Sequence, residues 1–193
     1  MALPTYNKAK RKKAFTPLPK GAYVVEIKGA REDSNKSGSG SHLTIAFDIA
    51  EGEYAGYYQK RFDDNPNEDK KWPNDATYYL TVPGDDSQSF IWDNWNTFFA
   101  DLEDSNNGYV FSGKPKDLKG KKIGGKFHIE QTSFNGNIYD HTRLRWTCVA
   151  DDVRSGNAGA LPKDKLIAAS LASNMDDYAT GFENAELEED LPF

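Results

Sequence analysis

The sequence predicts a mainly β domain of five strands, with one helix between the third and the fourth strand. Three observations support this. Several short segments rich in β-branched and aromatic residues alternate apolar and polar side chains, which is the period of a half-buried strand. Residues 85–106 instead repeat their apolar residues at helical spacing. An Asn-Gly pair at 135–136 separates the last two alternating segments, which is typical of a tight β-hairpin.

The first three predicted strands follow one another as a meander. In residues 21–33 the side chains of Tyr23, Val25 and Ile27 fall on one side, and residues 42–51 alternate in the same way. The loop between these two strands contains only small, polar and flexible residues and one lysine, which is typical of a mobile loop. The predicted strands and the connections between them are 21–33, 34–41, 42–51, 52–56 and 57–63.

A polar stretch leads from the meander to the predicted helix. Residues 64–75 contain an isolated Trp72, and residues 76–82 have the composition of a short additional strand. Asp86 or Ser87 can cap the helix, and Gly108 can end it in the left-handed conformation. The apolar face of the helix consists of Ile91, Trp95, Phe98, Phe99 and Leu102.

Two further strands, 121–133 and 137–149, complete the domain and enclose the hairpin turn. The resulting order of strands and helix is that of a five-stranded OB-type barrel, whose helix lies between strands three and four. Other small α+β folds contain the same number of elements. Beyond Asp151 the chain becomes rich in Gly, Ala and Ser, and residues 162–172 have the composition of one short helix.

The charges divide the chain more sharply than its net charge of −6 suggests. Residues 1–20 contain six basic and no acidic residues, residues 176–193 contain seven acidic and no basic residues, and the chain without this tail has a net charge of +1. Such asymmetry favours nucleic-acid contact at one end and protein contact at the other, although solvated ends explain it equally well. The predicted divisions are a basic flexible arm at 1–17, the OB-type DNA-binding domain at 18–153, a linker at 154–175 and an acidic tail at 176–193.

The single cysteine, Cys148, excludes an internal disulfide and favours a reducing cytoplasm. No apolar run is long enough to span a membrane. The N-terminal segment is basic but is not followed by the hydrophobic core of a secretory signal. We therefore expect a cytoplasmic location.

The predicted fold suggests where a ligand binds. OB folds bind oligonucleotides or sugars on strands two and three and on the loops after strands one and four. Binding of a single strand requires cations for its phosphates and exposed rings for its bases. The closing strand places Tyr139, His141, Arg143 and Arg145 opposite the face formed by Ile138, Leu144 and Trp146. The candidate DNA-binding residues are Lys28, Arg31, Lys36, Tyr57, Lys60, Arg61, Trp72, Phe134, Tyr139, Arg143 and Arg145.

Several of these residues also have a structural interpretation. Trp72 can fold back onto the barrel instead of stacking on a base, and Phe134 can either pack across the hairpin or stack on a base. Arg143 and Arg145 can either form cross-strand ion pairs with Glu130 or Asp48 or bind phosphate. Tyr57 and its neighbour Tyr58 cannot both point inward in a strand, and the pattern does not decide between them.

The residues give little support to an enzyme. The three histidines are scattered and Cys148 stands alone, so no metal-binding spacing is present and no cofactor is expected. The Gly- and Lys-rich segment 113–126 lacks the Ser or Thr that a phosphate-binding loop requires after its lysine. A magnesium-dependent nuclease site is an alternative that would use Asp63, Asp64, Glu68 and Asp69, but a solvated turn explains these carboxylates better.

The body of the chain resembles the single-stranded DNA-binding replication proteins encoded by tailed phages of Gram-positive bacteria. The resemblance covers roughly residues 15–165. It rests on "LPKGAYVVEIKGA" (18–30), "LTIAFDIAEGEYAGYY" (43–58), "FFADLEDSNNGYVF" (98–111), "LKGKKIGGKF" (118–127) and "DDVRSGN" (151–157). It implies an OB-type fold and DNA binding without catalysis, in the cytoplasm of the host cell. The segment "TSFNGNIYD" (132–140) is a local variant of the family pattern.

The C-terminus resembles a second, wider pattern. Bacterial single-stranded DNA-binding proteins end in an acidic run followed by Asp-Ile-Pro-Phe, and this chain ends in Asp190, Leu191, Pro192 and Phe193. The resemblance implies that the tip recruits replication or recombination proteins. A terminal Phe ring can fill an apolar pocket while its carboxylate meets a basic residue, and the acidic run can steer the encounter.

We therefore expect a non-enzymatic protein that binds single-stranded DNA, protects it during phage replication or recombination, and recruits partners through its tail. The alternatives are an OB-fold adaptor that binds protein and, less favoured, the magnesium-dependent nuclease.

Overall fold

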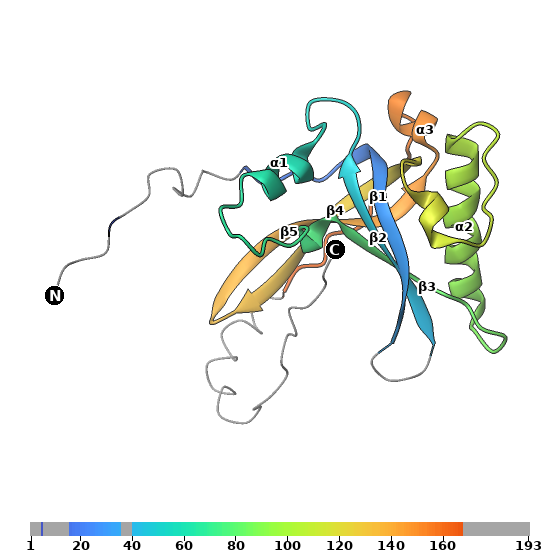
Figure 1. Ribbon diagram of the computed structural model, residues 1–193, viewed down its shortest axis with the longest axis horizontal. Helices are drawn as coiled ribbons and strands as arrows, with labels where there is room; N and C mark the ends of the chain where they lie inside the picture. The colour runs from blue at the N-terminus through green and yellow to red at the C-terminus, as the bar shows by residue number, and fades with distance from the viewer. Residues whose placement is uncertain (1–4, 6–15, 36–39, 168–193) are drawn as a thin grey trace.

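The computed structural model describes residue 5 and residues 16–35 and 40–167. Five strands form one open antiparallel sheet in the order β3-β2-β1-β4-β5, with α2 between the third and fourth strands in the chain (Figure 1). The prediction of a mainly β domain with five strands is confirmed. The elements are β1 (Ala22–Ser34), β2 (Ser41–Ile49), α1 (Tyr57–Asp63), η2 (Asn74–Ala76), β3 (Thr77–Thr81), α2 (Ser89–Ser105), η3 (Pro115–Leu118), β4 (Lys122–Phe134), β5 (Asn137–Cys148) and α3 (Ala150–Arg154).

The core lies on the inner face of the sheet and is covered by α1 and α2. The alternating residues of β1 and β2 point into it as predicted, and Ile27, Ile45 and Phe47 are almost completely buried. The rings of Phe47, Tyr58 and Phe127 meet edge to face with centroids 5.7 and 5.8 Å apart. Such contacts add stabilisation beyond the area that they bury.

Residues 57–63 form the helix α1, so the prediction of a third strand there is wrong, and the third strand is residues 77–81. Gly56 takes the left-handed conformation with φ of 73° and turns the chain out of β2. The buried carboxylate of Asp48 then accepts hydrogen bonds from the backbone amides of Tyr58 at 2.8 Å and Gln59 at 3.2 Å. These amides belong to the first helical turn and have no partner within the helix, so Asp48 satisfies them from β2.

The helix α2 confirms the predicted apolar face, since Phe98, Phe99 and Leu102 are buried. The predicted cap is wrong: the helix begins at Ser89 without a side-chain cap, and Ser87 Oγ accepts a hydrogen bond from the amide of Gly84. At the other end the side chain of Asn106 joins the helix to β4. Its Nδ2 donates to the carbonyl oxygens of Leu102 and Lys122, and its Oδ1 accepts from the Lys122 amide.

The hairpin between β4 and β5 turns at Asn135 and Gly136, whose φ values of 50° and 74° are those of the predicted two-residue turn. A bulge interrupts the pairing further along, because Phe127 opposes Leu144 while Lys126 opposes Trp146. Arg145 is therefore an extra residue on β5, and the alternation reverses there. The prediction that Trp146 shares a face with Ile138 and Leu144 is wrong, because the bulge turns Trp146 to the opposite face, where it is exposed, whereas Leu144 packs against the core.

After β5 the chain forms α3 and then returns to the sheet. Residues 162–167, the described part of the predicted helix 162–172, are not helical, and Lys165 instead pairs with Glu130 in a parallel bridge. Lys36, most of the basic arm and the acidic tail lie outside the described residues. Among the described residues, no helix combines the length and the apolar character that crossing a membrane requires.

An ion-pair network holds α3 against the turn after β2 and makes stability depend on pH. The carboxylate of Glu51 accepts hydrogen bonds from Arg154 at 2.8 and 2.9 Å and from Lys122 at 2.9 Å, which lowers the pKa of Glu51 to about 2. Because this folded-state pKa lies below the unfolded value, the stabilisation is present above about pH 4.5 and is lost as the pH falls toward 2.

We therefore expect Glu51→Gln to lower the free energy of unfolding by about 0.5–1 kcal/mol at neutral pH, since the network is partly exposed. The difference from the wild type should shrink when urea unfolding is repeated near pH 3. An equal difference at both pH values would show that the ionised carboxylate is not the stabilising form.

Candidate nucleic-acid interface

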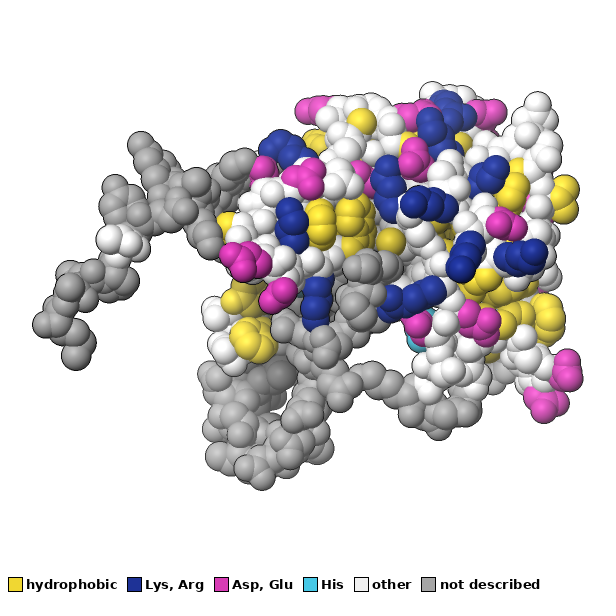
Figure 2. Space-filling model, viewed as in Figure 1, with side chains coloured by type: hydrophobic (Ala, Val, Ile, Leu, Met, Phe, Trp, Pro, Cys, Tyr) yellow, Lys and Arg dark blue, Asp and Glu magenta, His cyan; other side chains and the backbone are white. Residues whose placement is uncertain are grey.

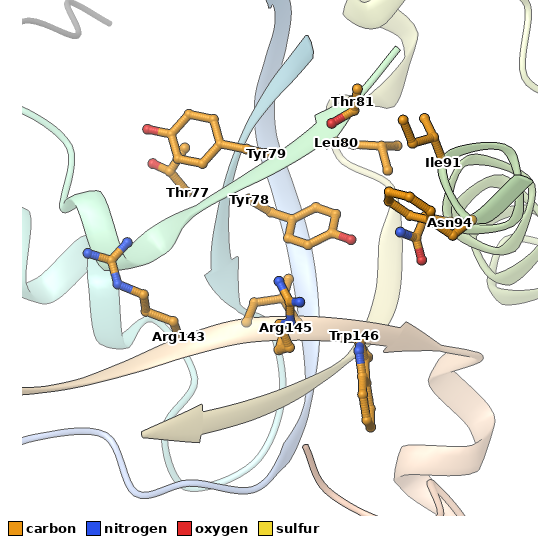
Figure 3. Close-up of a pocket in the computed structure, with 12 residues that line it drawn as sticks. Thr77, Tyr78, Tyr79, Leu80, Thr81, Ile91, Asn94, Arg143, Arg145 and Trp146 are labelled. Atoms are coloured by element: carbon orange, nitrogen blue, oxygen red, sulfur yellow. The ribbon is translucent and has the colours of Figure 1, made fainter. Parts of the chain in front are cut away.

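A cleft of about 380 Å³ lies between β3 and β5, the two edge strands of the open sheet (Figure 3). Residues 77–81 of β3 form one wall and residues 143–146 of β5 form the other. Phe90, Ile91 and Asn94 of α2 line one side of the cleft. Figure 3 shows Arg143 and Arg145 reaching from β5 toward β3, whereas Trp146 points from the other side of β5. The cleft thus brings together cations and aromatic rings from three elements.

The two arginines of β5 are in different electrostatic environments. Arg143 is half-buried, and its Nε lies 3.2 Å from Oε2 of Glu130. Arg145 is exposed, and within the part of the chain that the structure describes no carboxylate lies at ion-pair distance from it. Burial raises the pKa of Tyr78, and the positive charge of nearby Arg145 opposes this rise. Arg145 can therefore meet an anionic ligand without breaking an ion pair inside the described domain.

Tyr79 forms an exposed aromatic platform beside this cleft. Its side chain is 43% exposed, and its ring meets His42 edge to face at 5.6 Å. Burial raises the pKa of Tyr79, while the nearby cations Arg143 and Arg31 lower it. The ring consequently lies near two guanidinium groups, which is the combination of stacking surface and positive charge that single-stranded nucleic acid requires.

Hydrogen bonds on the outer face of β1 and β2 hold the side chains beside Tyr79 in place. Arg31 pairs with Asp33 at 2.8 Å, and Thr44 Oγ1 donates to the same carboxylate at 2.7 Å. His42 Nδ1 is hydrogen-bonded to Asn35 Oδ1 at 2.8 Å. In the ladder Thr44 pairs with Tyr79 on β3 and with Arg31 on β1, so these three residues form one row across three strands.

The other predicted site residues are distributed over the molecule. On α1, Tyr57 donates to the carbonyl oxygen of Thr16 at 2.9 Å, Lys60 pairs with Asp64 at 2.9 Å, and Arg61 pairs with Asp75. Lys28 pairs with Glu26 at 2.8 Å. Trp72 donates to the carbonyl oxygen of Ala76 at 3.3 Å and packs against the core, which agrees with its structural interpretation.

Two predicted residues lie at the hairpin, where β4 and β5 extend beyond the core. Phe134 is 58% exposed and Tyr139 is 46% exposed, so neither ring is enclosed by the fold. Their neighbour His141 is hydrogen-bonded through Nε2 to Thr132 Oγ1 at 2.9 Å. The tip therefore offers stacking surfaces separate from the lining of the cleft.

Sequence reasoning missed four aromatic residues of the cleft: Tyr78, Tyr79, Phe90 and Trp146. Tyr78 and Tyr79 lie in the segment that was predicted only as an additional strand, and the two rings take opposite faces. Phe90 lies outside the apolar stripe of its helix and is 56% exposed. A large ring outside such a stripe is the signal that could have revealed it.

Positive charge is also present away from the cleft. Figure 2 shows Lys and Arg side chains gathered across one face of the described domain, with Asp and Glu among and around them. Lys114, Lys116 and Lys119 are exposed in and beside η3, and none of them lines the cleft. Basic charge alone therefore does not mark one site, whereas basic charge together with exposed rings marks the cleft.

The cleft can bind phosphates through guanidinium groups and bases through stacking on its rings. Among the described residues, His, Cys, Asp and Glu side chains form no group of three or more suited to a metal ion. No family model matches the chain, and no curated protein is similar to it in sequence.

Proposed function

We propose that this protein binds single-stranded DNA without catalysis and protects it during phage DNA replication or recombination. The observation that supports this proposal is the convergence of Arg143 and Arg145 with Tyr78 and Tyr79 in one cleft. The arginines bind phosphate oxygens through charge-assisted hydrogen bonds, and exposed Tyr79 stacks on a base.

The exposed rings favour an unpaired strand over a duplex. In a duplex the faces of the bases are stacked on one another, so Tyr79 and Phe90 would find no open base. A single strand can turn its bases toward the protein while its phosphates follow the arginines. Stacking does not distinguish strongly between bases, so we expect little sequence preference.

The proposal includes a barrel of OB type that is open at the cleft. Support comes from the pairing, because β1 is joined to β2 on one side and to β4 on the other. The helix α2 follows the third strand, as in OB folds. The oligonucleotide would then lie where β3 and β5 face each other, next to the outer face of strands two and three.

The acidic tail adds a second element to the proposal. Asp190, Leu191, Pro192 and Phe193 lie outside the described residues, and their proposed role in recruiting replication or recombination proteins rests on the sequence. The same feature supports the second candidate function, an adaptor whose domain binds protein. The nuclease has weaker support, since Asp63 accepts a hydrogen bond from Gln59 and Asp64 pairs with Lys60.

Titration with oligo-dT tests the proposal, because binding should quench or shift the protein's fluorescence and weaken as salt rises. We expect Tyr79→Ala to cost about 1–3 kcal/mol of binding free energy, or roughly 5- to 150-fold in affinity, if the ring stacks on a base. Tyr79→Phe is the matched control and should retain most of the affinity, because it keeps the ring and removes only the hydroxyl group.

The same titration separates the alternatives. Lack of oligo-dT binding at low salt would contradict the proposed function. If binding is absent and deletion of Phe193 abolishes capture of a replication protein, the adaptor is the better account. Magnesium-dependent cleavage of the oligonucleotide would instead support the nuclease.

A further inference from the structure

Residues 163–167 run alongside the part of β4 with which β1 does not pair, and we call these residues the strap. β1 pairs with β4 only through Lys122–Lys126, so the side of β4 that faces β1 is open beyond these residues. The strap fills it: the Lys165 amide donates to the carbonyl oxygen of Ile129 at 2.8 Å, and the Gln131 amide donates to that of Lys165 at 2.9 Å. The strap therefore continues the sheet as a short parallel neighbour of β4.

Side chains fix the strap on both sides of Lys165. Asp164 accepts a hydrogen bond from the Ile129 amide at 3.0 Å and pairs with Lys20 at 2.7 Å. The amide of Ile167 donates to Gln131 Oε1 at 3.1 Å. The backbone of Lys165 is consequently held in register with β4, which fixes the position from which its side chain extends.

The side chain of Lys165 connects the strap to the cleft through Glu130. Lys165 Nζ lies 2.7 Å from Glu130 Oε1, and Arg143 Nε lies 3.2 Å from Oε2 of the same carboxylate. Only the contact to Lys165 has the geometry of a hydrogen bond, since the buried Nε of Arg143 has no hydrogen-bond partner among the residues that the structure describes. One carboxylate is thus shared between two cations, and the strap lysine makes the shorter contact.

We propose that Lys165 is a positioning residue for nucleic-acid binding, because it neutralises Glu130 and so keeps Arg143 available to a phosphate. This inference rests on the proposed function. Without Lys165, the full charge of Glu130 would act on Arg143 and draw its guanidinium into a tighter pair. The uncompensated carboxylate would also repel a phosphate beside Arg143.

The experiment uses the full chain and oligo-dT. We expect Lys165→Gln to weaken binding roughly 3- to 10-fold at low salt and to reduce the salt slope by about 0.7, the value for one lost phosphate contact. Lys163→Gln is the matched control: it removes the same charge two residues earlier in the strap, and Lys163 forms no ion pair with Glu130. It should bind like the wild type. Lys165→Arg should retain the affinity.

A second substitution distinguishes positioning from a structural role. Adding Glu130→Gln to Lys165→Gln should restore binding to near the wild-type level, because no carboxylate then competes for Arg143. Equal weakening by Lys163→Gln and Lys165→Gln, or failure of Glu130→Gln to rescue, would overturn the inference. Both outcomes require a wild type that binds oligo-dT, so they are distinct from failure of the proposed function, in which the wild type itself does not bind.

Discussion

Replacing Arg143 and Arg145 together by glutamate is expected to lower the affinity for oligo-dT by at least about 100-fold at low salt, with the fold retained. The change removes two phosphate contacts and places two negative charges in the cleft. The slope of log affinity against log salt should fall by roughly 0.7 for each lost contact. Arg145 is exposed and Arg143 is half-buried at an edge strand, so thermal unfolding should change little.

Lys114→Glu combined with Lys116→Glu is the matched control for this pair. It changes the net charge by the same amount, but the two lysines lie at η3 and do not line the cleft. We expect a small loss of affinity from long-range electrostatics alone. Equal losses from both pairs would indicate diffuse electrostatic binding, and unchanged affinity of the arginine variant would place the site away from β5.

The largest effect on stability is expected from Asp48→Ala. Asp48 is 2% exposed, and its carboxylate accepts hydrogen bonds from the amides of Ile49, Tyr58 and Gln59. An unsatisfied buried donor costs about 1–3 kcal/mol, so the free energy of unfolding should fall by about 3–5 kcal/mol. The total free energy of unfolding of a folded protein is only about 5–15 kcal/mol, so urea unfolding should detect the change readily.

Two variants serve as controls for Asp48. Asp48→Asn keeps one carbonyl acceptor and should lose roughly half as much free energy of unfolding. Asp63→Ala, in the helix α1 that Asp48 contacts from β2, removes an exposed carboxylate that accepts one hydrogen bond from the Gln59 side chain, and should change stability by less than about 0.5 kcal/mol. A change for Asp48→Ala as small as that for Asp63→Ala would show that Asp48 does not hold α1 in place.

The elements predicted correctly are those whose signal is local. Val25 and Ile27 alternate with polar residues along β1, Asn135 and Gly136 form the turn, and Phe98, Phe99 and Leu102 share a face of α2. Each pattern depends on neighbours in the chain, and the tertiary structure reinforces it. The segment 57–63 differs because its helical first turn is satisfied by Asp48, which lies in another element.

The candidate site could be predicted only in part, because part of it depends on contacts between elements that are distant in the sequence. Arg143 and Arg145 stand out as alternating cations on the closing strand. Tyr79 was missed because strand three of the expected barrel was placed in residues 57–63, so residues 76–82, predicted only as an additional strand, were not included in the expected binding face. Trp146 was assigned to the same face as Leu144 because the bulge at Arg145, which reverses the alternation, depends on pairing with β4.

Photo-crosslinking is the most direct test that single-stranded DNA lies in the cleft between β3 and β5. A thymidine-rich oligonucleotide carrying 5-iodo-deoxyuridine would be bound to the full chain, irradiated, and mapped to peptides by mass spectrometry. We predict crosslinks in the peptides that contain Tyr78 and Tyr79, Phe90, or Trp146. Crosslinks confined to the peptides that contain Trp72 or residues 113–122, with none in the lining of the cleft, would contradict this account.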